Sequence, residues 1–112
     1  MTDENNDLDH LATMIRSEMD QLKYLSETAK DSRAPVALDQ QSVGRLSRMD
    51  AMQQQSRELA TEERRQQRLA ALAAALRRVD SGGYGYCLEC DDKIAAGRLA
   101  VDPAVTLCID CA

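Results

Sequence analysis

Cys87-Leu88-Glu89-Cys90 and Cys108-Ile109-Asp110-Cys111 form two Cys-x-x-Cys pairs at the end of this 112-residue chain. They contain all four cysteines of the chain, and seventeen residues separate one pair from the other. Such a C-x2-C-x17-C-x2-C spacing is typical of a structural zinc site, in which each pair forms a tight turn that directs two thiolates at one point. The sequence therefore predicts one structural Zn²⁺ bound by Cys87, Cys90, Cys108 and Cys111.

Other roles for the cysteines agree less well with the rest of the chain. Two disulfides would suit a secreted protein, but the polar N-terminus contains no apolar signal-peptide segment. A redox-active Cys-x-x-Cys usually lies in a βαβ context, which neither pair has. The segment from Cys87 to Ala112 is also too short to fold on an apolar core alone, because chains below about 40 residues usually need metals or disulfides. Four protein ligands leave no position for a catalytic water, so we expect a structural site.

The composition favours a helical protein. The chain has no Trp or Phe and only three Tyr, so its apolar content lies mainly in Ala, Leu and Met. This composition suits helices packed side by side, and no segment reaches the ~20 apolar residues of a membrane span. We therefore expect a mainly α protein that is soluble and cytoplasmic.

The charge is unevenly distributed along the chain. The net charge is −5, whereas general nucleic-acid binders normally show a basic surface. Residues 1–86 are close to balance, with 12 basic and 14 acidic side chains, but residues 87–112 have two basic and five acidic ones. Because an acidic module is a poor ligand for phosphate groups, the charge favours a protein partner over direct DNA binding.

The apolar spacing before the cysteines predicts a long antiparallel helical hairpin, or coiled coil. We expect disorder at residues 1–6, a helix from about Asp7 to Lys30, a break at residues 31–39 around Pro35, and a second helix from about Gln40 to Val79. The second helix is polar in its middle and apolar again at its end. The apolar stripes of the two helices are Leu8, Leu11, Ile15, Leu22, Leu25 and Ala29, and Leu69, Leu72, Leu76 and Val79.

Two helices joined by a short break should fold back on each other. The stripes then form the seam of a monomeric hairpin, and self-association through the same stripes is the alternative. We expect the hairpin at residues 7–80 with its tip around residues 31–50, and a zinc-finger module at residues 81–112. Within the module we expect a short helix or turn between Lys93 and Val101, and Tyr84 and Tyr86 beside the zinc site.

The residues around the cysteines carry a resemblance to a known family. The residues concerned are Tyr84-Gly85-Tyr86-Cys87-Leu88-Glu89-Cys90, Ile94, Arg98-Leu99, Pro103 and Leu107-Cys108-Ile109-Asp110-Cys111. Together with the long hairpin before it, this pattern resembles the DksA/TraR family of four-cysteine zinc-finger proteins. The resemblance covers residues 40–112 well and the first helix by architecture only.

The resemblance implies a bacterial transcription regulator that binds RNA polymerase rather than DNA and is not an enzyme. Members of this family insert the hairpin into the secondary channel of the polymerase, the pore through which nucleotides reach the active site. A narrow rod can enter such a pore, and an acidic protein can dock on a basic surface. The alternatives are a zinc-ribbon adaptor that binds another protein or DNA, and a redox-responsive zinc switch that loses its metal on oxidation.

Two departures from the family pattern concern its functional residues. The best-known members carry an Asp-x-x-Asp-x-Ala motif at the hairpin tip, and this chain has no intact copy. The tip candidates here are Asp39 and Asp50, with Arg45 and Arg48 beside them. Their alternative roles are ordinary helix capping for Asp39 and a solvated helix face for Asp50.

The second departure concerns the alarmone guanosine tetraphosphate. In well-studied members, basic residues help to hold it against the polymerase, and we expect a weak response or none here, because only one of the four corresponding residues is basic. Arg64, Arg65 and Arg68 are candidates for docking on the rim of the polymerase channel, with a salt-bridged solvated face as the alternative. The four residues at the alarmone positions are Arg64, Ala71, Asp102 and Ala112.

Overall fold

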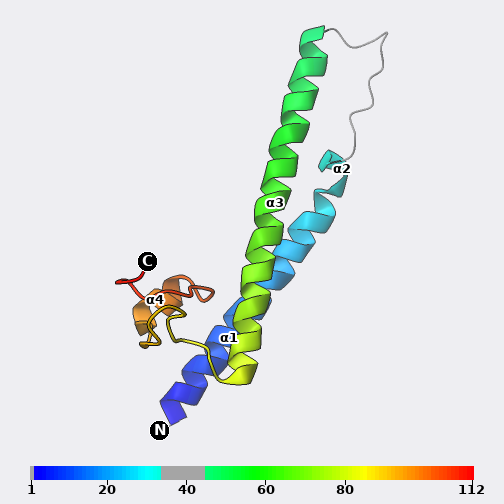
Figure 1. The fold of residues 1–112 in the computed structure, drawn as a ribbon. Coiled ribbons are helices and arrows are strands. Elements are labelled where there is room, and N and C mark those ends of the chain that lie inside the picture. The colour runs from blue at the N-terminus through cyan, green and yellow to red at the C-terminus, as the bar shows by residue number, and fades with distance from the viewer. Residues whose placement is uncertain (1, 34–44) are drawn as a thin grey trace.

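A long helical hairpin with a small module at its base makes up the structure (Figure 1). The computed structural model describes the backbone of residues 2–33 and 45–112, and the side chains of residues 7–31, 33 and 48–112. The hairpin consists of α1 (Thr2–Thr28), α2 (Lys30–Arg33) and α3 (Arg45–Ser81), and α4 (Ala96–Val101) lies in the module. The molecule measures 69 × 27 × 20 Å along its principal axes. The predicted mainly α fold, a hairpin followed by a four-cysteine module, is confirmed.

The helix boundaries differ from the expected ones near the N-terminus and at the break. α1 begins at Thr2, so residues 2–6 have helical backbone where the sequence predicts disorder. The physical reason is that extending an existing helix costs far less than nucleating a new one. The expected break begins later than residue 31, because α2 adds a helical turn that ends at Arg33. The expected helix start near Gln40 and the proline break lie outside the described residues.

α3 forms the full length of the rod and ends in a defined turn. It has 37 residues, about 55 Å at 1.5 Å per residue, and contains no Gly or Pro. The N–H of Gly83 donates to the carbonyl oxygen of Arg78 at 2.9 Å, and that of Gly82 donates to Val79 at 3.4 Å. Gly82 has a φ of 88°, which glycine adopts without a steric penalty, so the helix ends in a Schellman motif. The chain therefore enters the module in a fixed direction.

None of the helices that the structure describes has both the length and the hydrophobicity needed to cross a membrane.

One apolar core joins the base of the hairpin to the module. Ile15 of α1 and Leu72 of α3 are completely buried, and both belong to the predicted stripes. They pack in one cluster with side chains of the module, and the buried hydroxyl of Tyr84 donates to the carbonyl oxygen of Pro103 at 2.7 Å. Tyr84 therefore packs beside the cysteines as expected, whereas Tyr86 is exposed. The buried cluster consists of Ile15, Leu72, Ala75, Tyr84, Cys87, Ile94, Leu99 and Ala104.

Further along the hairpin, polar contacts join the helices. Glu62 of α3 accepts hydrogen bonds from Ser26 of α1 at 2.6 Å and from Gln66 at 2.7 Å. Arg33 of α2 and Arg65 of α3 lie 3.1 and 3.3 Å from the Glu62 carboxylate. The hydrogen bond from Ser26, followed by that from Gln66, holds the pKa of Glu62 below its ordinary value. Glu62 therefore joins α1, α2 and α3 through polar contacts, in a part of the hairpin where few apolar side chains are buried.

Truncating Leu72 should destabilise the protein strongly. We expect Leu72→Ala to lower the free energy of unfolding by about 2–5 kcal/mol, because the side chain is completely buried and its loss leaves a cavity. Leu59→Ala is the matched control on the same helix, since Leu59 is 49% exposed, and it should change stability by about 0.5 kcal/mol or less. Urea unfolding followed by circular dichroism measures both. An equal loss of unfolding free energy in the two variants would contradict the described packing of Leu72 in the seam.

The stability that Glu62 contributes should depend on pH. Because the pKa of Glu62 is lowered in the folded state from its ordinary 4.5, this contribution is present above that value and is lost as the pH falls through the folded pKa. Glu62→Gln should therefore be less stable than the parent at about pH 7, and the difference should narrow at about pH 3. Urea unfolding at both pH values measures this, with Glu63→Gln as the exposed control. A difference that stays constant with pH would argue against the described role of the carboxylate.

Candidate metal centre and surrounding surfaces

The four cysteines form one compact sulfur cluster. Their sulfur atoms all lie within 4.8 Å of one another, and the sulfur atoms of Cys90 and Cys108 are 3.6 Å apart. Zn–S bonds of ~2.3 Å in a tetrahedron place the sulfur atoms about 3.8 Å apart. The cluster therefore has the size that a tetrahedral zinc ion requires, and the structure brings together all four predicted ligands.

Backbone hydrogen bonds shape the first cysteine turn. The N–H of Cys87 donates to the carbonyl oxygen of Asp92 at 2.8 Å, and the N–H of Asp91 donates to the carbonyl oxygen of Cys87 at 3.0 Å. Asp91 has a φ of 62°, a left-handed conformation that lets the chain reverse after the second cysteine. An antiparallel bridge between Tyr86 and Lys93 closes the loop behind this turn. The two thiols therefore sit on a short, hydrogen-bonded loop.

The second cysteine turn is built in a similar way and is tied to the first. The N–H groups of Cys111 and Ala112 both donate to the carbonyl oxygen of Cys108, at 3.1 and 3.0 Å. The N–H of Leu88, in the first turn, donates to the carbonyl oxygen of Thr106 at 2.9 Å. The backbone therefore holds the two turns against each other, in addition to any bond through the metal.

The thiols perturb one another's ionisation. Hydrogen bonds from backbone N–H groups, that of Cys108 first, lower the pKa of Cys87 to about 6. Hydrogen bonding with the thiol of Cys108 in first place raises the pKa of Cys111 well above its usual range. The backbone N–H of Asp92 lowers the pKa of Cys90, but contacts with the thiols of Cys108 and Cys87 outweigh it and raise that pKa overall. Of these three thiols, that of Cys87 therefore has the lowest pKa.

A divalent cation resolves this competition. Its charge would stabilise all four thiolates together, and metal binding would release the thiol protons. Four sulfur ligands complete the tetrahedron, so no position remains for a water that could be activated. Cys87, Cys90, Cys108 and Cys111 therefore fit one structural Zn²⁺.

A charged bridge fixes the module against the hairpin. Nε and Nη2 of Arg68, on α3, donate to the carboxylate of Glu18, on α1, at 2.6 and 3.1 Å. Nη1 of Arg68 donates to Oδ1 of Asp102, just after α4, at 2.9 Å. The same oxygen of Asp102 accepts the N–H of Ala104 at 3.1 Å, which holds the carboxylate in place. Arg68 therefore connects α1, α3 and the module through one side chain.

The candidate tip residues differ in their exposure to solvent, and one of them lies outside the described residues. Asp39 lies outside the described residues, and Arg45 is the first residue of α3. Arg48 is half-buried and Asp50 is exposed on α3. Their role in binding a partner stays a prediction.

The three candidate rim arginines have different surroundings. Arg64 is exposed and donates to the hydroxyl of Thr61 at 3.2 Å within its own helix. Arg65 pairs with Glu62, and Arg68 binds Glu18 and Asp102. Arg64 is therefore the best placed of the three to contact another molecule, and partner binding by all three stays a prediction.

Sequence reasoning missed the roles of Glu18 and Asp102. Glu18 interrupts the apolar stripe of α1, which was a usable signal, because a charge at a seam position requires a partner. Asp102 offered no comparable signal, since its partner Arg68 is 34 residues away in the chain.

The fold and the metal site define a class of protein, namely a helical hairpin with a C-terminal four-cysteine zinc finger. Residues 82–112 match the family model of the prokaryotic dksA/traR C4-type zinc finger. The C-terminal module is therefore a zinc finger of the dksA/traR C4 type, and the family match lies within that module.

Curated relatives are similar to part of this chain in sequence, and a solved structure is similar to it in fold. The chain is 38% identical over 53 residues to the RNA polymerase-binding transcription factor DksA of Caulobacter vibrioides, and the match covers 47% of this chain and 37% of that protein. It is 34% identical over 56 residues to DksA of Escherichia coli, covering 50% of this chain and 37% of that protein. The fold is similar to transcription factor DksA2 from Pseudomonas aeruginosa, with a TM-score of 0.78, 24% identity, and 95% and 80% of the two chains covered. The sequence matches thus span well under half of the curated relatives.

Loss of one metal ligand should unfold the module but leave most of the hairpin helical. We expect Cys108→Ser to lose stoichiometric zinc, because three thiolates cannot close the tetrahedron. Glu89→Gln is the control, since it changes a residue between two ligands without removing one. Zinc content and far-UV circular dichroism measure the outcome. A Cys108→Ser protein that retained one tightly bound zinc would show that the site differs from the one described.

Proposed function

We propose that this chain regulates bacterial transcription by binding RNA polymerase, with its hairpin inserted into the secondary channel, and so modulates initiation. The observation that carries the proposal is the combination of a dksA/traR zinc finger with a narrow rod that projects away from it. The similar proteins from C. vibrioides and E. coli are named RNA polymerase-binding transcription factors. On this proposal the chain is a regulator, not an enzyme, and works in the bacterial cytoplasm.

The shape of the molecule supports insertion of the hairpin. In Figure 1 the module lies beside the end of α3, and the far end of α3 extends to the opposite end of the molecule. The two smaller dimensions, 27 and 20 Å, include the module, so the projecting part of the rod is narrow. A rod of this kind can enter a pore while the module stays at its mouth. We therefore propose that the chain contacts the polymerase at two places, with the tip of the hairpin and with the module at its base.

The surface near the tip supports a role for Asp50. Its carboxylate is exposed, and Met49 and Met52, which flank it on α3, are also exposed. Exposed methionines adapt their shape to a partner surface, and a carboxylate among them offers charge to a basic group or a metal ion. We therefore propose that Asp50 acts at the polymerase active site.

At the base, the contacts favour Arg64 as the rim-docking residue. Arg65 and Arg68 form ion pairs within the chain, so their contact with a partner would compete with these pairs. Asp102, at one of the alarmone positions, accepts a hydrogen bond from Arg68. This pairing supports the expectation of a weak response to guanosine tetraphosphate, or none.

Binding to core RNA polymerase tests this proposal directly. We expect the zinc-loaded chain to bind and to change the lifetime of open promoter complexes. Asp50→Ala should keep the affinity within about twofold but lose the effect on lifetime, because the tip acts after docking. Gln53→Ala, an exposed neutral change three residues away, is the control and should behave like the parent.

The possible outcomes distinguish the candidate functions of the chain. Binding without any effect on lifetime would make the chain a competitor for docking rather than a regulator. A chain that fails to bind the polymerase would favour the zinc-ribbon adaptor. Binding and lifetime effects that are both unchanged in Asp50→Ala would exclude Asp50 as the acting residue.

A further inference from the structure

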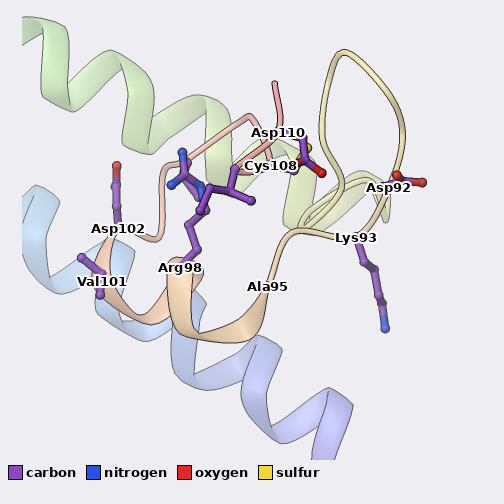
Figure 2. Close-up of a pocket in the computed structure, with 10 residues that line it drawn as sticks. Asp92, Lys93, Ala95, Arg98, Val101, Asp102, Cys108 and Asp110 are labelled. Atoms are coloured by element: carbon purple, nitrogen blue, oxygen red, sulfur yellow. The ribbon is translucent and has the colours of Figure 1, made fainter. Parts of the chain in front are cut away.

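A hollow lies in the zinc module between α4 and the second cysteine turn, and Asp102, the partner of Arg68, also lines it (Figure 2). Its volume is about 520 Å³, which is enough for one or two side chains of another molecule. Figure 2 shows Arg98 rising from α4 towards the segment that contains Cys108 and Asp110. Nε of Arg98 donates to the carbonyl oxygen of Leu107 at 3.0 Å, so this guanidinium ties α4 to the segment just before Cys108.

Two strongly exposed apolar side chains line the hollow. Val101, the last residue of α4, is 88% exposed, and Ile109, inside the second Cys-x-x-Cys, is 78% exposed. Ala95 and Val105 add further apolar surface to the lining. At about 25 cal/mol per Å², covering such side chains stabilises a complex appreciably. The exposed valine and isoleucine therefore favour an apolar contact from a partner.

The charge around this apolar surface is negative. Asp92 and Asp110 line the hollow and are exposed. Residues 87–112 contain two basic and five acidic side chains, and four thiolates on one Zn²⁺ add about two further negative charges. Two basic side chains, Lys93 and Arg98, also line the hollow beside three acidic ones, Asp92, Asp102 and Asp110. Nε of Arg98 donates to the carbonyl oxygen of Leu107, and in Figure 2 the side chain of Lys93 extends away from the other labelled side chains. A partner that enters the hollow therefore meets apolar walls within a negative field.

We propose that this hollow binds a protein segment in which an apolar side chain is flanked by lysine or arginine. The apolar side chain packs against Val101 and Ile109, and the basic residues face Asp92 and Asp110. An anionic ligand is disfavoured by the same charges, as is a wholly apolar segment, which would leave the acidic rim without a partner. The inference does not depend on the proposed function, because it concerns the chemistry of the segment and not the identity of the protein that carries it.

Binding of short peptides to the full zinc-loaded chain tests the inference. The probe is the synthetic peptide Lys-Leu-Lys-Lys-Leu-Lys, and its counterpart has Glu in place of each Lys. We expect the basic peptide to shift the amide NMR signals of residues around the hollow, with a dissociation constant of about 0.1–1 mM, and the acidic peptide to leave them unchanged. The reporting residues are Ala95, Val101, Val105 and Ile109.

A matched pair of variants locates the contact. Val101→Lys replaces the apolar wall with a positive charge and should weaken binding about tenfold. Ala100→Lys places the same charge on the neighbouring exposed residue of α4, which does not line the hollow, and should weaken binding by about twofold or less. Zinc content and thermal unfolding of both variants show that the module remains folded.

Three results would overturn the inference. The first is that Val101→Lys and Ala100→Lys bind the basic peptide with equal affinity. The second is that the peptide shifts amide NMR signals all along the acidic surface, without a maximum at the hollow. The third is a change in the same signals with protein concentration alone, which would show that a second copy of the chain occupies the hollow.

Discussion

The rest of the structure depends on four cysteine sulfur atoms that the chain gathers into one small cluster. The module has few buried side chains of its own, among them Tyr84, Ile94 and Leu99, and these pack in one cluster with Ile15 and Leu72 of the hairpin. A metal that closes this loop contributes its binding energy to folding, because the unfolded chain has no preformed site. Because the module and the hairpin base share this cluster, the metal constraint extends into the rod.

The sequence was sufficient to predict the structure where the interactions that determine it are local. Two Cys-x-x-Cys turns define their own geometry, and the 3-4 stripes that contain Ile15 and Leu72 follow directly from helical periodicity. The sequence was insufficient where a charged side chain chooses among distant partners. Arg68 lies in a mixed-charge run, and the sequence does not indicate that its partners are Glu18, fifty residues away, and Asp102. Charged side chains have no periodic signature that indicates such a choice, because either solvent or a partner can satisfy them.

The boundaries near the tip show the same limit. α2 ends at Arg33, whose guanidinium donates to the carbonyl oxygen of Ser26 at 2.8 Å and lies beside Glu62. These long-range contacts stabilise a helical turn where local propensity predicts a break. A tertiary contact of this kind overrides a weak local preference, so a single sequence indicates that a break exists more reliably than where it begins.

The molecule presents two chemically different ends. Exposed methionines and a carboxylate lie on α3 towards the tip, and an acidic face with an apolar hollow lies on the module. Both ends are joined by one continuous helix, so a contact made at one end fixes the direction in which the other end points.

The polar contacts of Glu62 and Arg68 prevent α1 and α3 from sliding along each other. A purely apolar seam can slide by one helical turn, about 5.4 Å, and still bury leucine against leucine. Here such a slip would separate Glu62 from Ser26 and Arg68 from Glu18 at the same time, and would leave charges without partners at a half-buried interface. The two pairs therefore fix the register of α1 against α3. Because Arg68 also binds the module, the distance from the zinc site to the far end of the hairpin is set by the same side chain.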